Sequence, residues 1–244
     1  MAKTFEALKR AEEEKKAWAG ANSLTPGPGK LGKLKIYSRT VEEYHRVKYK
    51  ILSSNHNHPI KALLFCSSRP AEGNSTVLTH FALTLASEGD QVLLVDANLR
   101  TPSLHQTFHL ERENGLTDLC CGKRSLAEVV KKTRFENLWV ITSGIRHPNP
   151  FAIFENRVLD PHIEQMKAGA EWVLFDSPPI KSYTDSIALA RKMDGVVMVV
   201  QAEKTRWEVA QHNIERLESG NGNILGVILN QRRFYIPGWL YKTL

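Results

Sequence analysis

Residues 61–76, KALLFCSSRPAEGNST, have the types and the spacing that could bind phosphate. The apolar run at 62–66 predicts a buried strand, small turn-forming residues follow it, and an apolar pattern at helical spacing begins at Val77. A strand, a loop and a helix start in this order are typical of a loop whose backbone N–H groups hold a polyphosphate. In such loops a Lys contacts the outer phosphates and a Ser or Thr hydroxyl holds Mg²⁺. Because Asn74 stands at the Lys position, we expect the chemistry of the site to depend on it.

Two carboxylates end apolar runs elsewhere in the chain. Asp96 closes QVLLVD and Asp176 closes EWVLFD. A carboxylate at such a strand end could hold Mg²⁺ through water or accept a proton from an attacking hydroxyl, which are the two tasks of phosphoryl transfer. A single strand-end Asp is a weak indication, because acidic residues also form turns there. Together with the loop, the pair predicts a phosphate-handling site.

The rest of the chain alternates strand and helix patterns. Near-continuous apolar strands indicate burial on both faces, so we predict an α/β fold, a doubly wound, mostly parallel sheet flanked by helices, as in P-loop NTPases. Ligands of such sheets bind beyond the carboxyl ends of the strands, where the loop and both carboxylates fall. We expect strands at 61–66, 91–96, 137–142, 171–176, 195–201 and 223–229, and helices at 41–52, 75–88, 125–133, 151–168, 184–192 and 206–219.

The sequence predicts three regions. Residues 1–19 form a charged N-terminal helix, residues 20–36 a Pro- and Gly-rich linker, and residues 37–244 the P-loop domain with a basic and aromatic C-terminal tail. That tail, NQRRFYIPGWLYKTL, either packs on the domain or lies at a membrane interface, where Trp and Tyr are favoured and basic residues meet anionic lipid.

The amino-acid composition indicates which binding partners and which cellular compartment to expect. Lys and Arg number 33 against 26 Asp and Glu, and the net charge of +7 indicates either an acidic partner, such as a membrane surface or nucleic acid, or a solvated basic surface. We expect no nucleic acid partner. Three Cys form no disulfide framework, which predicts a reducing, cytoplasmic setting. The apolar runs are too short to span a bilayer, so any membrane link is expected to be peripheral, at the inner membrane.

Three segments together resemble a known family. SSRPAEGNST, VLLVDANLRTPSLHQTF and VLFDSPP are similar to the Walker A, A′ and B motifs of the bacterial tyrosine kinases that control capsule and exopolysaccharide synthesis. These kinases belong to the wider Min- and Par-type ATPase class. The resemblance covers about residues 41–230, with the three motifs in the family's order and spacing.

That resemblance implies ATP or ADP as the ligand and Mg²⁺ as the cofactor. It assigns Ser75, Asp96 and Asp176 to the metal, with contact to the tyrosine hydroxyl as an alternative task for Asp96. Asp96 and Asp176 are therefore the residues we expect to be catalytic. The positions expected to contact the nucleotide are Ser68, Pro70, Glu72, Gly73, Asn74, Ser75, Thr76 and Asn230, of which Gly73 and Thr76 match phosphate contacts and Asn230 matches the position that reads adenine.

Two positions inside the motifs depart from the family pattern. Asn74 replaces the Walker A Lys, and Asn98 replaces the second Asp of Walker A′. The loss of a cation beside the outer phosphates is expected to reduce turnover more than binding, because the backbone amides of the loop remain. Arg69 and Arg100 are near enough in sequence to supply the missing charge.

Two regions outside the three motifs correspond to the family's subunit-contact motif and tyrosine cluster. EEYHRVK resembles the family's subunit-contact motif E-x-x-R-x-x-R, with Glu42, His45 and Lys48 at its three places, which implies a homo-oligomer. Two of the three residues differ from the pattern. The tyrosine cluster that these kinases phosphorylate is reduced here to Tyr235 and Tyr241.

Three functions are compatible with these observations. The favoured one is a kinase-like nucleotide-binding regulator, weak or inactive in phosphotransfer, that acts with the cytoplasmic segment of a membrane polysaccharide co-polymerase. The second is an active ATP-dependent protein-tyrosine autokinase with the same partner. The third is a Min- or Par-type switch ATPase that binds membrane or DNA, although the loop lacks the additional Lys of that class.

Overall fold

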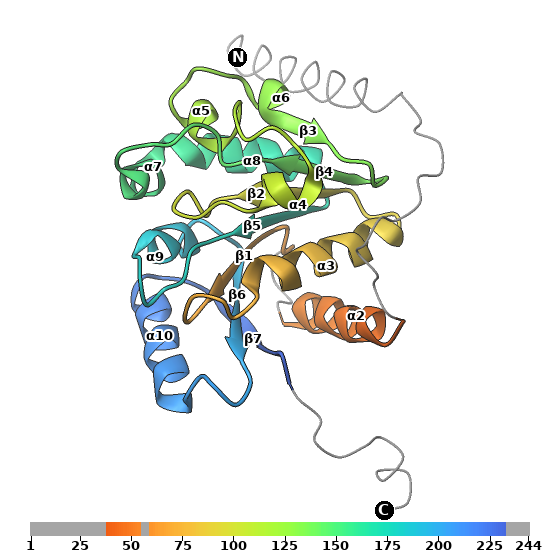
Figure 1. Ribbon diagram of the computed structural model, residues 1–244, viewed down its shortest axis with the longest axis vertical. Helices are drawn as coiled ribbons and strands as arrows, with labels where there is room; N and C mark the ends of the chain where they lie inside the picture. The colour runs from red at the N-terminus through yellow and green to blue at the C-terminus, as the bar shows by residue number, and fades with distance from the viewer. Residues whose placement is uncertain (1–37, 55–58, 233–244) are drawn as a thin grey trace, which may run out of the picture.

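The computed structural model describes residues 38–54 and 59–232 of the chain (Figure 1). The predicted helix at 1–19, the whole predicted linker at 20–36, the first domain residue, and the C-terminal tail after residue 232 lie outside the described residues. Among the residues that are described, no helix is both long enough and apolar enough to cross a membrane.

A seven-stranded sheet forms the centre of the domain, in the order β3-β4-β2-β5-β1-β6-β7. All neighbouring strands pair in parallel except β3, which is antiparallel to β4. The predicted doubly wound, mostly parallel sheet is therefore confirmed. The strands are β1 (Ala62–Ser67), β2 (Val92–Asp96), β3 (Val130–Lys132), β4 (Leu138–Ile141), β5 (Trp172–Asp176), β6 (Gly195–Gln201) and β7 (Ile224–Asn230).

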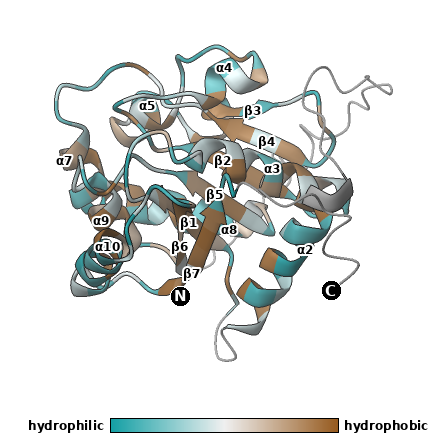
Figure 2. Cartoon of the chain, turned by 60° about the horizontal axis from the view of Figure 1, so that its bottom comes forward, coloured by the Kyte–Doolittle hydropathy of each residue, from teal (hydrophilic) through white to brown (hydrophobic). Residues whose placement is uncertain are grey.

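Helices cover both faces of this sheet, with α2 and α3 on one face and α7 to α10 on the other (Figure 1). Figure 2 shows hydrophobic strands in the middle of the molecule and hydrophilic residues along α2 and α10. The helices are α2 (Ser38–Ser53), α3 (Asn74–Ser87), α4 (Leu104–Phe108), α5 (Leu116–Cys120), α6 (Leu126–Val129), α7 (Pro150–Glu155), η1 (Arg157–Leu159), α8 (Asp160–Gly169), α9 (Asp185–Ala190) and α10 (Trp207–Ser219).

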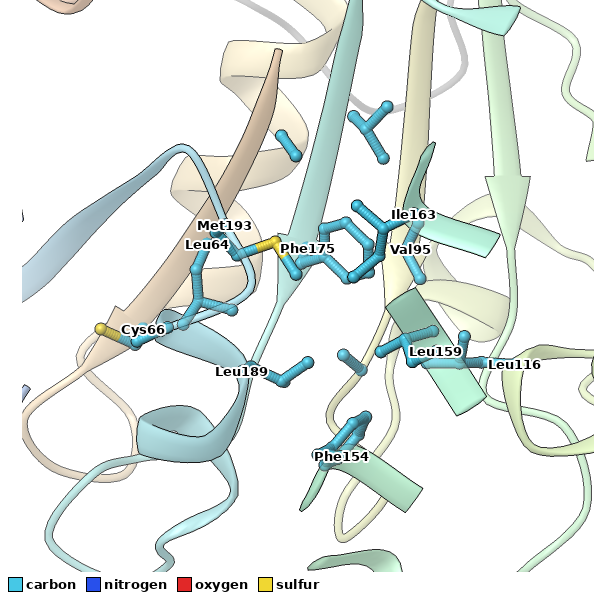
Figure 3. Close-up of a cluster of buried hydrophobic side chains, with 14 of the residues drawn as sticks. Leu64, Cys66, Val95, Leu116, Phe154, Leu159, Ile163, Phe175, Leu189 and Met193 are labelled. Carbon is cyan, nitrogen blue, oxygen red and sulfur yellow. The ribbon is translucent and has the colours of Figure 1, made fainter. Parts of the chain in front are cut away.

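Successive residues of β1 serve two separate hydrophobic layers. Leu63 and Phe65 pack with α2 and α3, whereas Leu64 and Cys66 pack on the opposite face. Figure 3 shows the second layer, in which Phe154 and other helical side chains meet the strands. All six residues of β1 are buried, because a central parallel strand is covered on both sides. This burial fixes the strand end from which the phosphate loop departs.

Two predicted helices are wrong in extent. The helix expected at 125–133 ends at Val129, and the chain continues as β3, because Val130 and the residues after it pair with β4 at the sheet edge. The helix expected at 151–168 is broken at Asn156, whose extended backbone (φ −69°, ψ 151°) separates α7 from η1 and α8. Pro161 in the first turn of α8 favours a new helix start there. The short helices α4 and α5 were not expected.

Candidate phosphate and metal site

The phosphate loop connects β1 to α3 and turns at Gly73. The φ of Gly73 is +86°, and a Cβ added there would lie 2.4 Å from Nδ2 of Asn230. Only glycine meets both requirements at low cost. The backbone N–H of Val77 donates to the Gly73 carbonyl at 2.9 Å and closes the first turn of α3. The strand, loop and helix start therefore form as the sequence predicts.

Glu72 stabilises this loop, because its carboxylate is hydrogen-bonded within the protein. Its carboxylate is buried and accepts the backbone N–H of Arg69 at 2.8 Å and the hydroxyl of Thr205. The Glu72 carbonyl accepts Nδ2 of Asn230 at 2.8 Å, so the predicted adenine contact lies against the loop. Glu72 thus joins the loop to the segment between β6 and α10.

A pocket of about 240 Å³ opens over the loop. It includes six of the seven predicted loop positions. The seventh, Ser68, is buried away from the pocket, where its hydroxyl accepts Nδ2 of Asn213 at 2.6 Å. Thr101, Ser177 and Pro179 were not predicted to line the site, although each follows a motif carboxylate in the sequence. The pocket is lined by Ser67, Pro70, Ala71, Glu72, Gly73, Asn74, Ser75, Thr76, Asn98, Thr101, Ser177 and Pro179.

Asn74 reaches across this pocket's floor to the end of β5. Its Nδ2 donates to Oδ1 of Asp176 at 2.8 Å and to the carbonyl of Phe65 at 3.0 Å. The other corner of the carboxamide, Oδ1, is buried and has no hydrogen-bond partner among the described residues. The residue at the lysine position therefore binds a motif carboxylate within the protein.

The two motif carboxylates lie side by side, since Asp96 and Asp176 are register partners of β2 and β5. Both are completely buried. Burial raises the pKa of Asp176 to about 6, against the hydrogen bonds from Ser75 and Asn74 that lower it. The Ser75 hydroxyl donates to Oδ2 of Asp176 at 2.6 Å. Asp176 thus accepts from both residues that begin α3.

Asp96 accepts its hydrogen bonds from the backbone. Its Oδ2 accepts the backbone N–H groups of Ser103 and Leu104 at 3.1 and 3.0 Å, and its Oδ1 is buried without a partner. Burial and then the charge of Asp176 raise the pKa of Asp96 well above its usual value. In the described part of the chain no Lys or Arg is paired with either carboxylate. Among residues 38–54 and 59–232, the side chains at this site offer oxygen atoms and no paired cationic group.

These side chains fit Mg²⁺. The unpartnered Oδ1 of Asp96, the Asp176 carboxylate and the Ser75 hydroxyl are oxygen ligands of the kind that Mg²⁺ prefers. No group of three His, Cys, Asp or Glu side chains with metal-site geometry occurs in residues 38–54 and 59–232. Mg²⁺ commonly keeps several waters and takes further oxygens from a substrate phosphate, so two carboxylates and a hydroxyl suffice.

Comparison with known proteins agrees with this geometry. A family profile described as an AAA domain matches residues 66–219. The chain is 32% identical over 192 residues to the tyrosine-protein kinase YwqD of Bacillus subtilis, covering 79% of this chain and 81% of that protein. It is also 32% identical over 200 residues to the tyrosine-protein kinase CpsD of Streptococcus agalactiae, covering 82% of this chain and 86% of the relative. The chain belongs to the bacterial tyrosine-kinase family.

Solved structures share the fold. The chimerical protein CapA2B2 superposes with a TM-score of 0.77 at 25% identity, over 83% of this chain and 88% of that one. The kinase domain of the Escherichia coli tyrosine kinase ETK gives a TM-score of 0.75 at 23% identity, over 82% and 80%. MinD of Pyrococcus horikoshii with Mg-ADP gives 0.61 at 21% identity, over 75% and 76%.

Within this bacterial tyrosine-kinase domain, Arg100 does not supply the missing lysine charge. Its guanidinium forms a two-bond pair with the fully buried Asp185, with Nε to Oδ2 at 2.9 Å and NH2 to Oδ1 at 3.1 Å. The same group lies 4.7 Å from the ring centre of Tyr183. The expectation for Arg100 is therefore wrong, because Asp185 already holds it. Arg69 is exposed on the loop.

Asn98 shapes the Walker A′ segment of the domain. Its Oδ1 accepts the backbone N–H of Thr101 at 3.1 Å and the Thr101 hydroxyl at 3.3 Å. Where the family has a second carboxylate, this chain has a neutral turn-forming side chain that lines the pocket. Among the described residues, the paired carboxylates at the ends of β2 and β5 are therefore Asp96 and Asp176 alone.

The helix α2 carries the predicted subunit-contact positions. Nε2 of His45 lies 2.7 Å from Glu88, and Nζ of Lys48 lies 2.6 Å from Glu88 and 2.5 Å from Asp90. Glu42 is exposed. Two of the three side chains therefore have partners within their own chain, and their role between subunits stays a prediction.

Proposed function

We propose that the chain is a nucleotide-binding regulator of capsule or exopolysaccharide synthesis that is weak or inactive in phosphotransfer. It binds ATP or ADP with Mg²⁺ at the phosphate loop. Asn74 carries this proposal, because a neutral carboxamide bound to Asp176 occupies the place of the catalytic lysine. The site keeps Ser75 and Asp176 for the metal and Asn230 beside the loop, whereas Asn98 is a second departure from the family pattern.

The loss of the lysine acts on the reaction more than on binding. Backbone N–H groups at the start of a helix bind phosphate without any side chain, and α3 begins at the loop. A charge-assisted hydrogen bond to the transferring phosphoryl group, worth roughly 1.5 to 3 kcal/mol, is absent. Charge that develops in the transition state loses this donor, so the rate falls roughly tenfold to 150-fold. Asp96, at the end of β2 beside Asp176, is the candidate to accept the proton of a tyrosine hydroxyl.

The proposed partner is the cytoplasmic segment of a membrane polysaccharide co-polymerase. Membership of a family that acts in capsule and exopolysaccharide synthesis supports this choice. The proposed location is the cytoplasm, peripheral to the inner membrane, with homo-oligomers formed through the face of α2 that bears Glu42. The partner, the location and the oligomer involve surfaces outside the pocket, whereas the proposed loss of phosphotransfer activity depends on the residues that line the pocket.

An active tyrosine autokinase is the second candidate, because Asp96, Asp176 and Ser75 are all in place. The experiment measures nucleotide affinity and tyrosine phosphorylation for the native chain and for Asn74→Lys, each alone and with the partner segment. Gln165→Lys, an exposed change on α8 outside the pocket, controls for added charge. The proposed function requires that the native chain binds nucleotide and that Asn74→Lys phosphorylates faster. Equal phosphorylation by the two chains would establish the active kinase instead.

A further inference from the structure

Two buried oxygen atoms without partners flank Asp176. One is Oδ1 of Asn74, on a residue that is 7% exposed, and the other is Oδ1 of the fully buried Asp96. Asn74 reaches Asp176 by a hydrogen bond of 2.8 Å, and Asp96 is its register partner in the sheet. A buried acceptor without a donor is unfavourable, and native structures seldom keep one unless a ligand or water satisfies it.

The orientation of the Asn74 carboxamide is fixed by its surroundings. Its Nδ2 faces three acceptors, which are Oδ1 of Asp176 at 2.8 Å and the carbonyls of Phe65 at 3.0 Å and Ser177 at 3.4 Å. Exchanging the two ends of the amide would set an oxygen against three oxygens. The carbonyl oxygen must therefore lie at the unpartnered corner.

The chemistry of the missing partner follows from what surrounds it. The unpartnered atoms are acceptors, the two neighbouring groups are carboxylates, and no Lys or Arg pairs with either of them in the described part of the chain. Bound phosphate would bring further negative charge into this pocket. A hard cation with oxygen ligands satisfies the acceptors and balances the charge together.

We propose that Oδ1 of Asn74 is a ligand of a divalent cation, and that nucleotide binding depends on this cation because the fixed lysine charge is missing. This inference rests on the proposed nucleotide-binding function. Asn74 would then bind the cation, and would not act only through the absence of the lysine. Loops with a lysine carry a fixed charge at this position, whereas this loop would acquire one only when the cation is bound.

The first test measures ADP affinity by calorimetry with Mg²⁺ and with EDTA. We expect the native chain to lose at least about tenfold in affinity without Mg²⁺, and Asn74→Lys to change less than about threefold, since its charge is fixed. Equal ADP affinity of the native chain in both buffers would overturn the inference.

The second test needs no nucleotide. Mn²⁺ binding, followed by electron paramagnetic resonance, should weaken by about tenfold in Asn74→Ala and be unchanged in Asn156→Ala, an exposed change outside the phosphate pocket. Circular dichroism verifies that each variant is folded, and Asn74→Lys is a second variant that should also weaken Mn²⁺ binding. Equal Mn²⁺ affinity in native, Asn74→Ala and Asn74→Lys chains would overturn the inference. Absence of ADP binding in every chain would overturn the proposed function, while the Mn²⁺ comparison would still decide the role of Asn74.

Discussion

Arg100→Ala should destabilise the domain through the carboxylate that it leaves behind. Asp185 is completely buried, and its side-chain oxygens pair with the guanidinium at 2.9 and 3.1 Å. The pair joins the Walker A′ segment, in which Arg100 follows β2, to the start of α9. Without Arg100, a buried charge has no counter-ion at this junction.

The magnitude follows from the burial of the two partners. Removal of one partner of a fully buried pair costs roughly 3 to 5 kcal/mol. The Arg100 side chain is 30% exposed, so water reaches part of the pair and reduces the cost. We therefore expect a loss of about 2 to 3 kcal/mol in the free energy of unfolding. In a second step, Asp185→Asn should restore part of the stability in the Arg100→Ala background, because a neutral amide needs no counter-ion.

Urea unfolding followed by circular dichroism measures both effects. The control is Arg124→Ala, which breaks an exposed pair with Glu128 whose side chains are 47% and 50% exposed. That change should leave the free energy of unfolding nearly unchanged, because water screens an exposed ion pair. A loss below about 0.5 kcal/mol for Arg100→Ala, or no recovery with Asp185→Asn, would refute the reasoning.

Three further changes probe other parts of the account. Gly73→Ala should abolish measurable ADP binding in calorimetry, because φ is +86° and the new Cβ would lie 2.4 Å from an amide nitrogen; unchanged affinity would contradict this. Burial raises the pKa of Asp176 to about 6, above about 3.9 in an unfolded chain, so the native state binds this proton first as the pH falls. Protonation of Asp176 therefore stabilises the fold increasingly as the pH falls from about 6 to about 4, and this stabilisation is lost as the pH rises through about 6. The corresponding pH dependence of the melting temperature should be missing in Asp176→Asn. Lys48→Met should loosen α2 by about 1 to 2 kcal/mol, read as faster hydrogen exchange, because Glu88 and Asp90 lose their shared cation; unchanged exchange in α2 would show that this contact is dispensable.

Local sequence patterns were enough to predict the mostly parallel sheet and the end of the strands at which the site lies. The fully buried strand β1 is recognisable because a strand covered on both faces must be apolar throughout. Strand β3 was not recognisable, since Val130–Lys132 carries two lysines at the sheet edge and follows a helical turn. The break at Asn156 depends on one extended backbone position, which periodicity does not show.

Long-range side-chain contacts were beyond the sequence patterns. Asn74 and Asp176 are 102 residues apart, and nothing in either motif indicates that a carboxamide would bind the carboxylate. Arg100 was expected to be available for phosphate, but its partner Asp185 lies 85 residues away in the sequence. Such pairs are set by which strand ends meet at the sheet edge, and therefore by the tertiary fold rather than by local spacing.

The rate of phosphoryl transfer at fixed, saturating Mg-ATP tests the central claim about Asn74 most directly. Single-turnover transfer to tyrosine is measured for the native chain and for Asn74→Lys, each with bound nucleotide verified beforehand. We predict that the lysine raises the rate roughly tenfold to 150-fold, as expected for one charge-assisted bond to the transferring group. Equal rates in two chains that bind ATP equally well would contradict it.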